Sequence, residues 1–188
     1  MAQERPRTLV DPGSMLARTH AVGGGMRVRL RLTRPSDAMR VRTFLERLSG
    51  ESRRRRFFTA MPVVNHTPVR HFTYYNPRER LVVAATAHVG RTETIVGVAD
   101  VSLLSTGLAE IGLVVADEHQ GRGVGALLSE AIASLALQQG ASHLKAEMLE
   151  RGGPMLSLMR RLGATVETFE DGAVVAHTRL PARHRYAA

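Results

Sequence analysis

Hydrophobic and polar residues alternate along several segments of the chain, which is the pattern of half-buried β-strands. In residues 26–32, for example, one Met, one Val and two Leu fall on one face and three arginines fall on the other. Further strands are predicted at residues 81–89, 95–104, 109–115, 143–149, 165–169 and 173–180. Asp171-Gly172 lies between the last two strands, and this dipeptide predicts a hairpin turn.

Between these strands, apolar residues recur at helical spacing. The longest such segment, residues 123–139, is a predicted helix that ends at Gly140. Shorter helices are predicted after residues 34–37, at residues 52–58 and at residues 154–162. In the first of these, the expected inward positions are Met39, Phe44, Leu45 and Leu48. The element order β-α-α-β-β-β-α-β-α-β-β predicts an α/β (α+β) fold, a mixed sheet with helices on its faces.

A chain of 188 residues suits one domain with a substantial core. We place this domain at residues 26–180. Residues 1–25 combine scattered charges, two prolines and a triple glycine, so we expect a flexible N-terminal extension there, and residues 181–188 are assigned to a C-terminal tail. The sequence has no long uninterrupted apolar run and no apolar leader, so we expect a cytoplasmic protein that does not enter a membrane.

Composition excludes some kinds of chemistry. The chain has no cysteine, which removes disulfides, thiolate metal sites and cysteine nucleophiles. The eight histidines lack the regular spacing of metal ligands, so we expect no bound metal.

The formal net charge of +9 is concentrated in residues 26–80, where there are fourteen arginines and four acids. A basic surface of this kind attracts nucleic acid, an acidic protein or an anionic cofactor. Stacking aromatics are not interleaved with the arginines, so nucleic-acid binding is the less favoured alternative. We interpret most of this charge, including Arg53–Arg56, as the solvated surface of a helix.

The segment 109–137 combines a short apolar strand, a polar turn, glycines at alternate positions 121, 123 and 125, and an amphipathic helix. Glycines at such a turn let the backbone approach a ligand, and the free N–H groups and positive dipole of the helix start favour a phosphate or pyrophosphate. Glu110 begins the strand and is a candidate general base; the alternative is an ordinary exposed strand glutamate. The glycines also fit the dinucleotide pattern G-x-G-x-x-G/A, but the four polar residues before them disfavour that interpretation.

With Gln120 included, the pattern Gln120-x-x-Gly123-x-Gly125 resembles the acyl-CoA pyrophosphate loop of the GNAT superfamily of N-acetyltransferases. The resemblance covers residues 26–180 and implies a mostly antiparallel sheet of about six to seven strands with helices on both faces. Residues 34–58 and 154–164 are also similar to the first and late helices of bacterial protein lysine acetyltransferase domains.

The resemblance implies an acetyl-CoA-dependent transfer of an acetyl group to a primary amine, by direct attack in a ternary complex and without a metal. A protein lysine is the favoured acceptor, and Glu110 is the expected base. The amide near Val114 is the expected oxyanion donor to the thioester. For Arg122, a salt bridge to phosphate and a solvated loop position both remain open. The residues that the resemblance assigns to the cofactor are Leu113, Val114, Val115, Gln120, Gly121, Arg122, Gly123, Val124 and Gly125.

Two departures from the family pattern keep an alternative open. Gly152 stands where the lysine acetyltransferase pattern has an asparagine, and the late helix lacks the tyrosine that protonates the departing thiolate in many relatives. The alternative is a non-catalytic acyl-CoA-binding sensor or interaction module.

Overall fold

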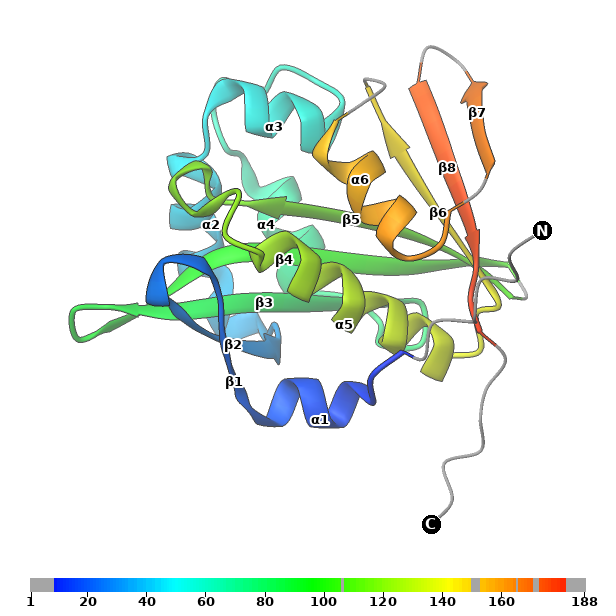
Figure 1. Cartoon of the computed structure of the whole chain (residues 1–188). Coiled ribbons are helices and arrows are strands. Elements are labelled where there is room, and N and C mark those ends of the chain that lie inside the picture. The colour runs from blue at the N-terminus through cyan, green and yellow to red at the C-terminus, as the bar shows by residue number, and fades with distance from the viewer. Residues whose placement is uncertain (1–8, 106, 150–152, 165, 171–172, 182–188) are drawn as a thin grey trace.

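The computed structural model describes residues 9–105, 107–149, 153–164, 166–170 and 173–181. Within these residues the strands form one eight-stranded sheet in the order β1-β2-β3-β4-β5-β6-β8-β7 (Figure 1). Only β5 and β6 pair in parallel; the other neighbours are antiparallel. The strands are β1 (Thr19–Ala21), β2 (Arg27–Leu32), β3 (Arg80–Val89), β4 (Thr92–Ser105), β5 (Leu108–Val115), β6 (His143–Met148), β7 (Val166–Glu170) and β8 (Ala173–Arg179).

Helices cover both faces of the sheet, as predicted (Figure 1). Helices α1, α5 and α6 share one apolar core with the sheet, and α2 and α4 share the other. None of the described helices combines the length and the apolar character that crossing a membrane requires. The helices are α1 (Pro12–Ala17), α2 (Ala38–Arg47), α3 (Gly50–Phe57), α4 (His66–Thr73), α5 (Val124–Gln138) and α6 (Pro154–Arg161), with short 3-10 turns at Gly23–Gly25, Pro35–Asp37 and Asp117–His119.

The mixed, mostly antiparallel sheet is thus confirmed, and the additional strand beyond the predicted six to seven is β1. Residues 9–25, predicted to be part of a flexible extension, contain α1, β1 and the 3-10 turn Gly23–Gly25. Met15 of α1 is buried in the core, and β1 pairs with β2 from Thr19↔Arg29 onward. The segment is attached by the packing of Met15, with the partly buried Leu9, Leu16 and Val22, and by edge pairing, none of which produces a periodic sequence. Residues 1–8 and 182–188, the remainder of the expected extension and most of the tail, lie outside the described residues, as does the predicted turn at 171–172.

One predicted core position in α2 is wrong. Met39 was expected to point inward, but its side chain is 71% exposed. Because α2 begins at Ala38, the inward stripe runs through Val41, Phe44 and Leu45, and Met39 lies on the opposite face.

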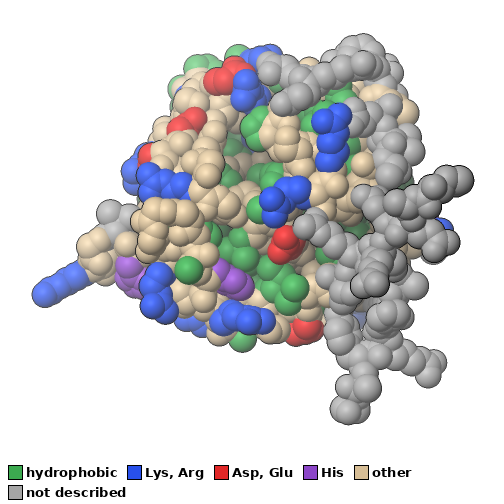
Figure 2. All heavy atoms as spheres, viewed as in Figure 1, with side chains coloured by type: hydrophobic (Ala, Val, Ile, Leu, Met, Phe, Trp, Pro, Cys, Tyr) green, Lys and Arg blue, Asp and Glu red, His purple; other side chains and the backbone are tan. Residues whose placement is uncertain are grey.

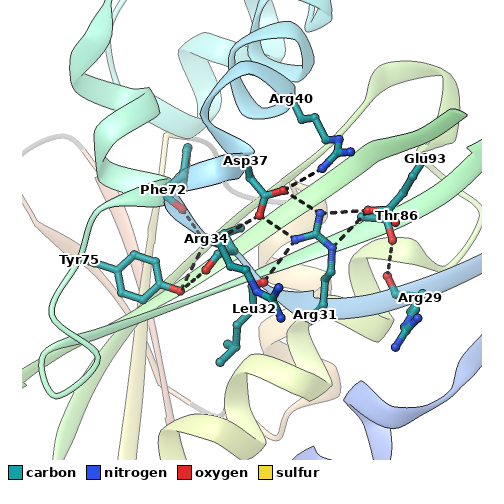
Figure 3. A network of polar contacts seen from close by, with 11 residues as sticks. Arg29, Arg31, Leu32, Arg34, Asp37, Arg40, Phe72, Tyr75, Thr86 and Glu93 are labelled. Atoms are coloured by element: carbon teal, nitrogen blue, oxygen red, sulfur yellow. Dashed lines mark hydrogen bonds and ion pairs between the residues drawn. The ribbon is translucent and has the colours of Figure 1, made fainter.

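An ion-pair network joins the end of β2 to the start of α2 (Figure 3). Arg31 donates hydrogen bonds to both carboxylate oxygens of Asp37, at 2.7 and 2.8 Å, and to Glu93 of β4 at 3.0 Å. The backbone N–H of Arg34 donates to the same carboxylate at 2.9 Å. The hydrogen bond from Arg31 outweighs burial and holds the pKa of Asp37 below its ordinary value.

A second set of hydrogen bonds attaches the end of α4 to β2 (Figure 3). The Thr33 hydroxyl donates to the Phe72 carbonyl at 2.6 Å, and the Tyr75 hydroxyl donates to the Thr33 carbonyl at 3.1 Å. These bonds position α4 over the sheet.

We expect Asp37→Asn to lower the free energy of unfolding by about 3 kcal/mol at pH 7, because it leaves Arg31 without its main anionic partner. The pKa of Asp37 is depressed in the folded state, so its contribution is present above the unfolded value of about 3.9 and is lost as pH falls through the folded value. The difference between wild type and variant, measured by urea unfolding, should therefore shrink below pH 4.

The matched control is Glu51→Gln, which removes a carboxylate from an exposed ion pair and should change stability little. An Asp37→Asn difference that is the same at pH 7 and pH 3 would contradict the assignment.

Candidate functional site

The strands β5 and β6 separate early. They pair only at Leu108↔His143, Ala109↔Leu144 and Glu110↔Lys145, and then diverge into a fork (Figure 1). A cavity of about 690 Å³ lies at this fork, lined by residues of β4, β5, β6, α3, α4 and α6. Figure 2 shows the surface hollowed between α3 and α6, with apolar side chains on the floor of the hollow.

The edge of β5 that faces the fork carries unpaired backbone groups. The Ala116 N–H donates to the Val96 carbonyl of β4 at 2.9 Å. Amides alternate in direction along a strand, so the Val114 amide also points toward β4, and those of Leu113 and Val115 point into the fork. The expected oxyanion donor at Val114 is therefore better placed on one of its two neighbours.

The glycine loop follows the 3-10 turn Asp117–His119 at the end of β5. Gly121 and Gly123 have φ of +71° and +93°, which glycine adopts without strain. The first main-chain hydrogen bond of α5 runs from the Leu127 N–H to the Gly123 carbonyl, at 3.0 Å. The N–H groups of the preceding helical turn are therefore free, at the positive end of the helix dipole, and suit a bound anion.

The structure brings most of the residues predicted to bind the cofactor to one cavity. The predicted site residues that line it are Glu110, Leu113, Val114, Val115, Gln120, Gly121, Gly123 and Gly125. Val124 is fully buried in the core, so only its backbone can serve a ligand. Arg122 does not line the cavity.

Arg122 instead lies against the triple-glycine turn. The Gly23 N–H donates to the Arg122 carbonyl at 2.8 Å, and a Cβ atom on Gly24 would lie 3.4 Å from the Arg122 guanidinium. The turn Gly23–Gly25, predicted to be part of a flexible extension, thus supports the glycine loop from outside the cavity.

Helix α3 holds the other side of the loop. The Asp117 carboxylate accepts hydrogen bonds from the Ser49 N–H, the Ser49 hydroxyl and the Ser52 hydroxyl, at 2.8, 2.8 and 2.7 Å. Burial raises the pKa of Asp117, but these hydrogen bonds lower it by more, so the pKa lies below its ordinary value. The Gln120 side chain donates to the Val115 carbonyl at 3.0 Å and to Ser52 at 3.2 Å. The role of the Gln120 side chain is thus to brace the loop.

Glu110 lies where the fork opens, and its carboxylate is 38% exposed. The ammonium of Lys145, the only lysine in the chain, is 3.3 Å from Glu110 and 2.8 Å from Glu147. The hydrogen bond to Glu147 and the attraction of Glu110 raise the pKa of Lys145 above its ordinary value. Glu110 is therefore held in place by a cation but remains open to a ligand from the cavity.

A buried carboxylate, Asp100 of β4, organises the wall beside Glu110. It accepts hydrogen bonds from the Arg56 guanidinium of α3 and from His71 Nε2 of α4, the latter at 3.1 Å. Arg80 of β3 donates to His71 Nδ1 at 3.1 Å. Arginine can only donate, so Nδ1 accepts, and the proton of the neutral ring resides on Nε2.

Burial raises the pKa of Asp100, but Arg56 and His71 more than reverse this effect, so the pKa lies below its ordinary value. This cluster was not predicted, because Arg53–Arg56 were expected to be a solvated helix surface. The Arg56 side chain is only 15% exposed and lies over Gly112 of β5. The one signal in the sequence is Asp100, an acid within the apolar stretch 95–101.

Helix α6 closes the cavity with residues that include Met155, Ser157 and Leu158. Gly152, the predicted departure from the family pattern, lies outside the described residues. Tyr74 is exposed and Tyr75 bonds to Thr33, and no tyrosine in the described part of the chain lines the cavity. The same residues contain no group of three or more His, Cys, Asp or Glu able to hold a metal ion.

A family model described as the acetyltransferase (GNAT) family matches residues 46–164. Among solved structures, the chain is similar to the GNAT domain of S. lividans PAT, with 29% identity over 87% of this chain and 96% of that one and a TM-score of 0.77. It is also similar to yncA from Salmonella typhimurium, solved with its cofactor acetyl-CoA, with 13% identity, a TM-score of 0.63 and coverage of 86% and 98%.

A third similar structure is a cAMP-binding acyltransferase from Mycobacterium smegmatis. The identity is 22% and the TM-score 0.60, and the match covers 87% of this chain but only 47% of that protein. This chain therefore spans about half of the M. smegmatis protein. The two likenesses below 25% identity show the fold alone.

We expect Gly112→Ala to disturb the buried wall, because the added Cβ would lie 2.9 Å from the guanidinium carbon of Arg56. Arg56 would have to shift away from Asp100 and weaken their hydrogen bond, at a cost of about 1–3 kcal/mol in the free energy of unfolding. Urea unfolding measures this cost. Gly50→Ala, where the added atom meets nothing within 4 Å, is the control, and equal stability of the two variants would refute the close packing of Arg56.

Proposed function

The chain belongs to the acetyltransferase (GNAT) family, whose members use acetyl-CoA as acetyl donor, and from this premise we propose the reaction and its residues. The reaction is direct attack of a primary amine, preferably a protein lysine, on acetyl-CoA, with Glu110 as the general base. One observation carries the proposal: Glu110, the free edge of β5 and the glycine loop all line the same cavity.

The donor side of the cavity suits the cofactor. Gly121 and Gly123 leave open space where a Cβ would stand, so a pyrophosphate can approach their backbone closely. The free amides of Leu113 and Val115 can pair with the pantetheine arm in the manner of an added strand, and one of them can polarise the thioester carbonyl.

Glu110 addresses the main barrier to the reaction. A lysine amine has a reference pKa of about 10.4, so only about one molecule in 2,500 is neutral at pH 7, a deficit of roughly 4.6 kcal/mol. The Glu110 carboxylate accepts a proton from the acceptor ammonium, directly or through water, and the neutral amine nitrogen then attacks the thioester carbon. The C–S bond breaks, CoA leaves as the thiolate, and the new amide nitrogen releases its second proton to water. A thiol pKa of about 8.5 makes departure without a proton donor tolerable.

The acceptor side supports an acceptor in acidic surroundings. Arg55, Arg56 and Arg80 all line the cavity and come from the arginine-rich segment 26–80. Arg55 and Arg56 are paired with Glu51 and Asp100, but Arg80 has no carboxylate partner among the described residues and can attract an acid beside the acceptor lysine. A protein lysine is therefore the acceptor that we propose.

We expect Glu110→Gln to lower kcat by about 10²–10⁴-fold at pH 7, because the amide cannot accept the proton. The loss should shrink toward pH 10, where the acceptor amine loses its proton unaided. Thiol release with a panel of lysine peptides measures the rate. Glu147→Gln is the control, since it also removes a carboxylate from Lys145 but leaves the base in place.

Full turnover of Glu110→Gln from pH 6 to pH 9 would exclude Glu110 as the base. If the wild type binds acetyl-CoA but releases no thiol with any acceptor, the non-catalytic acyl-CoA-binding alternative is the correct one.

We expect Gly123→Val to weaken acetyl-CoA binding at least tenfold, because the side chain would occupy the space open to the pyrophosphate. Isothermal titration calorimetry measures the affinity. Gly140→Val is the matched control at the other end of α5: Gly140 has φ of +99° and no atom within 4 Å of an added Cβ. Both variants should lose about 1–2 kcal/mol of stability through backbone strain, but only the first should lose affinity. Equal acetyl-CoA affinity of the two variants would show that the pyrophosphate does not bind at Gly123.

A further inference from the structure

Polar side chains form a row across the four central strands of the sheet, β3 to β6. The strand registers place Arg80 beside Ser102, Ser102 beside Glu110, and Glu110 beside Lys145. Neighbouring strands are about 4.8 Å apart, so the backbones of Arg80 and Glu110 are separated by about 10 Å. Both side chains line the cavity. Arg80 and Glu110 therefore present a cation and a carboxylate, with Ser102 between them, to a molecule that enters the cavity.

Arg80 differs from neighbouring cations. Of the lining arginines, Arg55 is paired with Glu51 and Arg56 with Asp100. Lys145, beside the cavity, lies between Glu110 and Glu147. Arg80 donates only to the Ser102 hydroxyl at 2.9 Å and to His71 Nδ1 at 3.1 Å. Neither partner carries a negative charge, and among the described residues no carboxylate lies within ion-pair distance of Arg80.

The same contacts orient the Arg80 guanidinium. Asp100 holds His71 in the tautomer that accepts from Arg80, so the side chain is fixed from two directions. These contacts use two of its five N–H groups and leave three for a ligand. A planar guanidinium with free N–H groups is suited to a carboxylate, which it can bind through two parallel hydrogen bonds.

We propose that Arg80 binds a carboxylate carried by the acceptor itself. The inference rests on the proposed function: the acceptor presents its ammonium to Glu110 and its carboxylate to Arg80, so each of these two side chains meets an opposite charge. A free amino acid and a lysine with an acidic neighbour in a peptide share this chemistry. Arg80 is a binding residue in this scheme and takes no part in proton transfer.

The experiment compares probes that differ only in the negative charge. One series consists of glycine, 4-aminobutanoate and 6-aminohexanoate, each with its amide. The other consists of lysine peptides that carry Glu or Gln next to the lysine. Affinity is measured by calorimetry on the full chain saturated with CoA, and turnover is measured as thiol release from acetyl-CoA. We expect at least one acid to bind ten times more tightly than its amide, and the preferred series identifies the source of the carboxylate.

Variants assign this preference to Arg80. Arg80→Gln should reduce the ratio of acid to amide affinity to less than about twofold, and Arg80→Lys should retain part of it because the charge remains. Arg78→Gln makes the same charge change at an exposed position outside the cavity and should leave the ratio unchanged. Acetyl-CoA affinity should be unchanged in all three variants, which shows that each is folded.

Equal binding of acids and amides in both series would overturn the proposal, and so would a preference that survives Arg80→Gln. The proposed function is tested separately in the same experiment. Turnover without a preference for acids refutes the carboxylate site but leaves acetyl transfer intact. A preference without turnover supports the carboxylate site and counts against catalysis.

Discussion

The early separation of β5 from β6 is the constraint from which the site follows. If the two strands continued to pair beyond Glu110, the amides of Leu113 and Val115 would be used within the sheet and the cavity would not exist. An unpaired strand edge normally invites association with another chain. Here the edge faces a cavity between α3 and α6, so its hydrogen-bonding capacity is reserved for a ligand of strand-like shape.

Two carboxylates, the exposed Asp117 and the buried Asp100, hold two sides of this cavity. Asp117 ties the glycine loop to the start of α3, and the turn Gly23–Gly25 supports the loop from its other side. Asp100 joins α3, α4 and, through His71, β3 at the wall beside Glu110. Helix α3 takes part in both clusters, so its position couples the glycine loop to this wall.

The features that the sequence predicted correctly are those encoded locally. Alternation predicted the strands β2 to β8, helical spacing predicted α5, and glycines 121 and 123 predicted the turn between β5 and α5. The errors concern residues whose environment comes from elsewhere in the chain. Met15 is buried by elements that are distant along the chain. Arg56 is one of four consecutive arginines, and its hydrogen bond to Asp100, 44 positions away, distinguishes it from the other three.

The sequence by itself indicated the family, a glycine turn beside a glutamate and most of the element order, although α1, β1 and α4 are absent from the predicted order. These features depend on neighbours along the chain. Only the tertiary structure decided which amides of β5 point into the fork and that Arg80, in the cavity wall, has no carboxylate within ion-pair distance among the described residues. Those properties depend on strand register and on partners brought together from α3, α4, β3 and β4. Local sequence patterns do not specify such long-range pairings, which form only when distant segments pack together in the folded chain.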